Sequence, residues 1–144
     1  GLHTVVHVIL GLPGESHADQ EGTVRYVAKS GAGGIKLQLL HVLRGTDLEA
    51  EYLAGRVPVM ELEEYADFVT DLIELLPPKM VLHRLTGDGP KRLLIAPLWS
   101  AQKKVVLNAI QQNLLKKDIC QGRLFHTASV FSDSAKNPEN PSFP

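Results

Sequence analysis

The chain of 144 residues contains a single cysteine, Cys120, and this scarcity excludes two kinds of site. One thiol cannot form an internal disulfide, so a reducing compartment, the cytoplasm, is expected. One thiolate also cannot hold an iron–sulfur cluster, which takes several cysteine ligands. The histidines do not show the H-E-x-x-H motif of zinc sites. No metal ligands are therefore predicted within the chain.

The sequence also lacks long apolar runs and an excess of charge of either sign. No segment approaches the roughly 18 apolar residues of a membrane-spanning helix, and no signal peptide opens the chain, so no membrane contact is expected. The formal net charge of −1 gives no general attraction to nucleic acid. Nucleic acid is therefore not expected as a partner of this segment.

The most informative stretch is an apolar, β-branched run at Val5–Leu10 that enters the turn Gly-Leu-Pro-Gly-Glu at residues 11–15. This pattern predicts a buried parallel strand whose carboxyl end meets a tight loop, where α/β proteins bind ligands. Ser16 and Asp19 form a capping box, which predicts a helix over residues 17–29. A simple turn between strand and helix explains the same loop equally well.

A second strand is predicted over residues 35–42, after a glycine-rich stop at 31–34. Strand, helix and strand within so short a span indicate a parallel βαβ unit. Apolar residues alternate from Ile35 to Leu39, and Lys36 and Gln38 would occupy the other face. That polar face suits a barrel whose lumen binds a ligand. An edge strand with both side chains in water is the alternative.

Two polar positions follow predicted strands. His41 ends the second strand, where barrel enzymes place catalytic groups, although a purely structural histidine fits the pattern too. Residues 83–92, His-Arg-Leu-Thr-Gly-Asp-Gly-Pro-Lys-Arg, begin at the end of a strand predicted over 80–85 and continue into a loop. Flexible glycines with cationic side chains could bind phosphate there, but the order of a P-loop is absent. An Asp-Gly turn with solvated charges is the alternative.

The remaining pattern is helical and then loses its apolar periodicity. Helices are predicted over residues 46–54 and 61–76, and a last one from a Ser100 cap to Lys117. The predicted organisation is a βαβα barrel portion over 1–55, a helix-and-strand extension packing on it over 56–121, and a disordered tail over 122–144.

Several motifs together resemble one protein family. Residues 8–15, Val-Ile-Leu-Gly-Leu-Pro-Gly-Glu, resemble the fifth-strand motif of radical S-adenosylmethionine (SAM) enzymes. Four later runs resemble, as an ordered set, the YhcC-like branch of bacterial radical SAM proteins, which is related to the Elp3 type. These runs are LHVLRGT at 40–46, EEY at 63–65, HRLTGDGP at 83–90 and APLWS at 96–100. The resemblance covers about residues 5–117.

This resemblance implies a fold and a set of site residues. The fold would be α/β, the C-terminal portion of a partial (βα) TIM-like barrel with parallel strands, followed by helices. Ile9, Gly11 and Leu12 would line the adenine side of bound SAM. The resemblance gives residues 83–88 no defined role. The substrate-side candidates, some lumen-facing and some at strand ends, are Lys36, Gln38, His41, His83, Arg84, Thr86 and Asp88.

The family's cluster ligands are missing, which shapes the functional expectation. Radical SAM enzymes hold a 4Fe-4S cluster through closely spaced N-terminal cysteines, and this chain has none at such positions. We therefore expect the C-terminal half of a radical SAM enzyme, inactive alone, whose full-length parent binds SAM and the cluster through its N-terminal half. Two alternatives remain: a phosphate-ligand barrel enzyme using the 86–92 loop, or a non-catalytic binding or assembly module with an exposed sheet edge.

Overall fold

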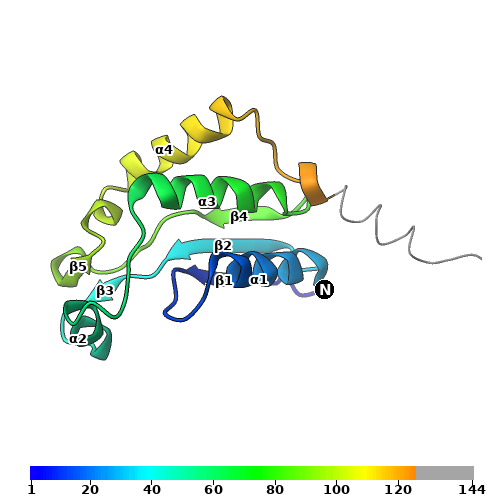
Figure 1. The fold of residues 1–144 in the computed structure, drawn as a ribbon. Coiled ribbons are helices and arrows are strands. Elements are labelled where there is room, and N and C mark those ends of the chain that lie inside the picture. The colour runs from blue at the N-terminus through cyan, green and yellow to red at the C-terminus, as the bar shows by residue number, and fades with distance from the viewer. Residues whose placement is uncertain (126–144) are drawn as a thin grey trace, which may run out of the picture.

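The structure is a computed structural model and describes residues 1–125. A parallel sheet forms its centre, in the order β1 (Val5–Leu10), β2 (Gly34–Leu39) and β4 (Val81–Arg84). Helix α1 (His17–Lys29) joins β1 to β2, and α3 (Leu62–Glu74) precedes β4 (Figure 1). The predicted parallel βαβ unit is confirmed.

Helix α1 begins and ends where the sequence predicts. The Ser16 hydroxyl accepts a hydrogen bond from the Asp19 amide at 3.2 Å, and the Asp19 carboxylate accepts one from the Ser16 amide at 2.8 Å. These reciprocal bonds satisfy amides that a helix start leaves unpaired. The hydrogen bonds from Ser16 lower the pKa of the Asp19 carboxyl. The loop after β1 is thereby fixed to a rigid helix.

The core lies on one face of the sheet only. Alternation along the strands places Val8 and Leu10 of β1, and the apolar positions of β2, against the inner sides of α1 and α3. The apolar residues of α3 are buried, apart from a half-buried Leu62. The opposite face of the sheet carries no helix of the described residues and is lined by side chains such as Ile9, Lys36 and Gln38.

The second strand is shorter than predicted. β2 ends at Leu39, although the Leu40 amide still donates to the Leu10 carbonyl at 2.8 Å. Beyond that point β1 has turned away at Gly11, where φ is +86°, so no parallel neighbour remains. Val42 instead begins β3 (Val42–Leu43), which pairs antiparallel with β5 (Leu94–Ala96), a strand that the sequence reasoning missed.

The last helix also begins later than predicted. Helix α4 spans Lys103–Lys116, and Ser100 lies in a preceding 3₁₀ turn, η2 (Leu98–Ala101). The Ser100 hydroxyl donates to the Pro97 carbonyl at 2.7 Å within that turn. It therefore does not cap α4, and the predicted cap was wrong. The other short elements are α2 (Asp47–Leu53), within the predicted 46–54 helix, and a 3₁₀ turn η1 (Lys91–Leu93).

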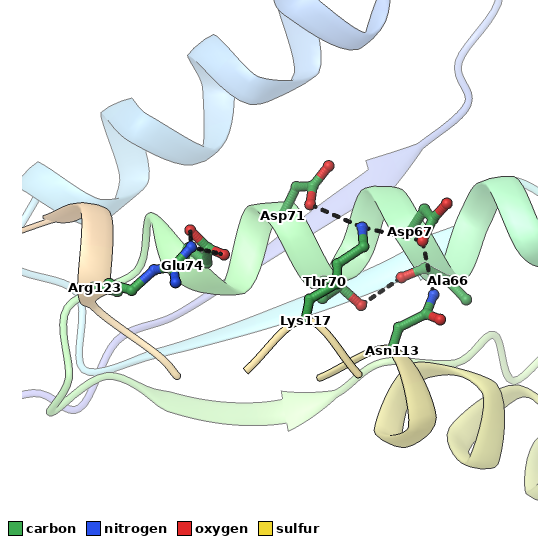
Figure 2. A network of polar contacts seen from close by, with 8 residues as sticks. All are labelled: Ala66, Asp67, Thr70, Asp71, Glu74, Asn113, Lys117 and Arg123. Carbon is green, nitrogen blue, oxygen red and sulfur yellow. Dashed lines mark hydrogen bonds and ion pairs between the residues drawn. The ribbon is translucent and has the colours of Figure 1, made fainter. Parts of the chain in front are cut away.

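Helix α4 packs on the outer side of α3. Helix α3 therefore lies between α4 and the sheet (Figure 1). Lys117 lies 3.1 Å from Asp67 and 3.4 Å from Asp71, and Asn113 donates to Asp67 at 2.9 Å (Figure 2).

No helix within residues 1–125 combines the length and the apolar character needed to cross a bilayer.

The first residues of the predicted tail belong to the folded part. Gly122 is buried against Pro78, and a Cβ at position 122 would lie 2.4 Å from the proline ring. Arg123 binds the buried Glu74 carboxylate at 2.9 Å (Figure 2). The boundary predicted at residue 122 is therefore too early, and the rest of the predicted tail, residues 126–144, lies outside the described residues.

Candidate functional site

A groove of about 420 Å³ opens at the carboxyl ends of the parallel strands, on the face that no helix of residues 1–125 covers. We call it the strand-end groove. Its polar lining consists of Gln38 from β2, His41, and Arg84 with Asp88 from the end of β4 and the following loop. Ile9 of β1 contributes to its apolar wall. Carboxyl ends of parallel strands are the usual position of ligand sites in α/β folds, so this groove is the candidate functional site.

The predicted SAM-side residues cluster at the end of β1. Ile9 is 37% exposed and lines the strand-end groove, whereas Leu12 and Gly11 lie in the loop that follows. The Gly11 amide donates to the Gln20 side-chain oxygen at 3.1 Å, and Gln20 is almost fully buried in α1. Gly11 therefore allows the turn through its positive φ, and its amide is already hydrogen-bonded within the protein. Ile9 is the member of the set that faces the groove.

His41 is packed into the glycine-containing loop after β4. A Cβ at Gly87 would lie 2.1 Å from His41 Cε1, and one at Gly89 would lie 2.8 Å from Nδ1, so only glycine fits beside the ring. The His41 Nε2 atom is buried without a hydrogen-bond partner among the described residues. Burial lowers the pKa of the imidazole. His41 therefore shapes the wall of the groove through its packing against the two glycines.

This environment predicts a pH dependence of stability. The unfolded chain takes up a proton on His41 near the ordinary pKa of about 6.5, whereas the folded chain takes it up at lower pH. The free energy of unfolding should fall as the pH drops below about 6.5, and the loss is complete below the folded pKa. Urea unfolding at pH 7.5 and 5.5 should show a smaller fall for His41→Gln than for the original chain. The exposed His7→Gln variant is the control, and an equal fall in all three proteins would contradict the account.

Arg84 is oriented by an ion-pair network. Its guanidinium lies 3.1 Å from one oxygen of Asp88, and Lys103 of α4 binds the other oxygen. The hydrogen bond and charge of Lys103, followed by the charge of Arg84, lower the pKa of Asp88. Asp88 thus ties the start of α4 to the end of β4 and holds Arg84 at the groove.

The structure separates the other sequence candidates. Lys36 lies two residues before Gln38 on β2, so the two side chains share the same uncovered face. Thr86 is 8% exposed and does not line the groove. His83 lies toward the amino ends of the strands, where its ring covers Gly34 and lies 6.0 Å from that of His3. Sequence adjacency therefore does not bring His83 into the site.

Two residues of the site were missed. Gln20 fixes the loop after β1, and its signal is a polar residue in the buried line of α1 that continues with Val24 and Val27. Lys103 reaches Asp88 across fifteen positions of sequence, and the basic pair 103–104 gave no signal of that contact. A local sequence pattern can indicate a polar residue in a buried helix face, such as Gln20. It cannot indicate a contact between distant segments, such as that of Lys103.

The comparisons with known proteins decide the family. The model of the Radical_SAM C-terminal domain matches residues 32–116. The chain belongs to this family. It is 39% identical over 125 residues to YtqA of Bacillus subtilis and 37% identical over 99 residues to YhcC of Escherichia coli. It is therefore a YhcC-like, radical SAM-related C-terminal segment. These alignments span 87% and 69% of this chain, but only 39% and 32% of the relatives' lengths.

A solved structure shows the same fold. The Elp3 of the archaeon Methanocaldococcus infernus, with residues 1–46 deleted, matches with a TM-score of 0.69 at 18% identity. The match covers 83% of this chain and 28% of the Elp3 chain. The predicted α/β fold, part of a TIM-like barrel with parallel strands, is thereby confirmed.

The groups that a radical SAM family implies can be compared with the residues present. In the part of the chain that the structure describes, no cluster of three histidine, cysteine, aspartate or glutamate side chains could hold a metal ion, and Cys120 is exposed. This segment therefore does not fit the iron–sulfur cluster. One side of SAM fits better, because the apolar Ile9 and the amide of Gln38 lie together at the groove.

Proposed function

We propose that this segment is the C-terminal part of a radical SAM enzyme, where it forms one wall of the SAM pocket and the substrate-facing side of the barrel. The observation that carries the proposal is the strand-end groove, which joins Ile9 to the polar side chains of Gln38 and Arg84 on an uncovered sheet face. The 4Fe-4S cluster and SAM would be held mainly by the preceding part of the longer protein. Bound together, they would supply the reductive cleavage of SAM.

The unpaired edge of the sheet favours the proposal that a preceding segment packs against this chain. β1 is an outer strand of the described sheet, so its outer backbone groups have no neighbouring strand among residues 1–125. A second groove runs along β1 beside α1, with an apolar lining that includes Val6, Val8 and Val27. A further parallel strand and helix would cover this surface. We propose that the N-terminal half of the same enzyme does so, in the reducing cytoplasm expected from the single cysteine.

The two alternative functions find less support. The loop at 86–92 is packed against His41, and its carboxylate, Asp88, already binds Arg84 and Lys103, so it offers no open phosphate cradle. An assembly module would use the free edge of β1, but it would not need polar side chains gathered at the strand ends. The groove therefore favours the enzyme.

Binding of SAM by the longer natural protein tests the proposal. Ile9→Asp places a charge against the adenine side, and we expect the affinity for SAM to fall by about tenfold or more, since an unpaired charge against an apolar ligand is costly. Isothermal titration under anaerobic conditions measures it. Val81→Asp is the matched control, because Val81 is an exposed apolar residue at the amino end of β4. Equal affinities in the two variants would contradict the assignment of Ile9.

A further inference from the structure

A row of basic side chains crosses the uncovered face of the sheet. This basic row consists of His7 on β1, Lys36 on β2 and Arg84 on β4. The strand register pairs His7 with Lys36, and Lys36 with Arg84. An extra residue in β4 makes this possible, because the register shift between Ile35 and Lys36 brings Arg84 rather than His83 beside Lys36. The three side chains therefore lie next to one another across all three strands.

Lys36 has no acidic partner among the described residues, although it is half-buried. Other basic residues of the fold do have such partners: Lys117 binds Asp67 and Asp71, and Arg123 binds Glu74 (Figure 2). Two cations side by side on neighbouring strands repel each other, and partial burial of a lysine side chain removes part of its contact with water. An anionic partner at this face would offset both costs.

Arg84 extends the positive charge to the groove. Its guanidinium shares the single carboxylate of Asp88 with Lys103, so one negative charge serves two cations. Gln38 lines the same groove one step along β2 and can donate hydrogen bonds through its amide. Of the basic row, only Arg84 lines the groove itself, and His7 and Lys36 lie on the sheet face outside that lining. Lys91 and Arg92 are exposed in η1 and also lie outside it.

We propose that the basic row, together with Gln38, binds an anionic group of the substrate, a carboxylate or a phosphate. This inference rests on the proposed function, because it takes the strand-end groove as the substrate side of the barrel. Arg84 would bind the anion through charge-assisted hydrogen bonds, and Lys36 would supply a second positive charge beside it. The site therefore selects substrates that carry an anionic group.

The test is an NMR titration of the 144-residue chain and of the longer protein with inorganic phosphate, with succinate, and with glycerol as the neutral control. Phosphate or succinate should shift the amide signals of Gln38 and Arg84, and glycerol should not. Arg84→Gln should weaken binding by about tenfold or more, the effect of losing a hydrogen bond to a charged group. Lys29→Gln, which removes an exposed positive charge on α1, should leave the affinity unchanged.

Lys36→Gln separates anion binding from a structural role. Since Lys36 has no ion pair in the described chain, the variant should keep or raise the free energy of unfolding while it weakens anion binding. A loss of stability with unchanged affinity would overturn the proposal. So would binding that SAM displaces, or binding by the short chain that disappears in the longer protein, because the anion would then belong to SAM or to another segment. Binding of SAM by the longer protein without any anion response would refute this inference and leave the proposed function intact.

Discussion

Replacing Tyr65 by alanine should lower the free energy of unfolding by about 3–5 kcal/mol, as truncation of large buried aromatic residues does. Tyr65 is 1% exposed in the first turn of α3, and its ring centroid lies 5.5 Å from that of Trp99. Its hydroxyl donates to the Leu85 carbonyl at 2.9 Å, and burial raises its pKa. The side chain thus joins α3 to the segment that leads from β4 into the loop beside the groove.

Two further variants divide the effect of Tyr65 into its parts. Tyr65→Phe keeps the ring and loses the hydrogen bond to Leu85, so we expect a loss of about 1 kcal/mol. Tyr26→Ala removes a tyrosine side chain that is 77% exposed and should change stability by less than about 0.5 kcal/mol. Urea denaturation of the three variants measures these values. Similar losses for Tyr65→Ala and Tyr26→Ala would contradict the packing described for α3.

Gly87→Ala should cost about 1–3 kcal/mol, the range for overpacking a filled site. The added methyl carbon would lie 2.1 Å from His41 Cε1 and 2.2 Å from Nε2, so the ring must move out of the loop. Urea denaturation gives the cost, and the His41 imidazole signals in NMR spectra should report the displacement. The variant therefore tests the contact that shapes the wall of the groove.

The controls for Gly87 distinguish crowding from a general effect of alanine. Gly22 lies inside α1, and beyond the neighbouring backbone of its own helix no atom lies within 4 Å of an added Cβ, so Gly22→Ala should stabilise the chain by about 0.5–1 kcal/mol. In the double variant His41→Ala with Gly87→Ala, the space of the missing ring should remove most of the crowding cost. Additive losses in that double variant would show that the two residues are not in contact.

The regular part of the fold follows from local patterns in the sequence. The capping box at Ser16 and the apolar run at Val5–Leu10 each depend on neighbouring residues, so both elements were predicted with their observed bounds. The short strands β3 and β5 depend instead on each other, across a gap of some fifty residues. Neither has a periodic pattern long enough to be recognised alone, and their pairing also explains why β2 ends early.

The candidate site was predictable only in part, for the same reason. Gln38 follows from strand alternation and Arg84 from its place at a predicted strand end, whereas Ile9 was expected from the family resemblance. The structure brings the three to one groove. His83 was grouped with Arg84 because the two are adjacent, but the register shift leaves His83 as an extra residue in β4 and gives the two different neighbours. The contact of Lys103 with Asp88 arises from the packing of α4 and has no local signal.

The most direct measurement of the central claim is the production of 5′-deoxyadenosine from SAM. The longer natural protein, purified and reconstituted with iron and sulfide without oxygen, is reduced with dithionite, and the product is quantified by chromatography. The 144-residue segment is treated in the same way as the control. The account predicts product from the longer protein and none from the segment. A longer protein that forms its cluster but releases no 5′-deoxyadenosine would contradict the assignment of this chain to a radical SAM enzyme.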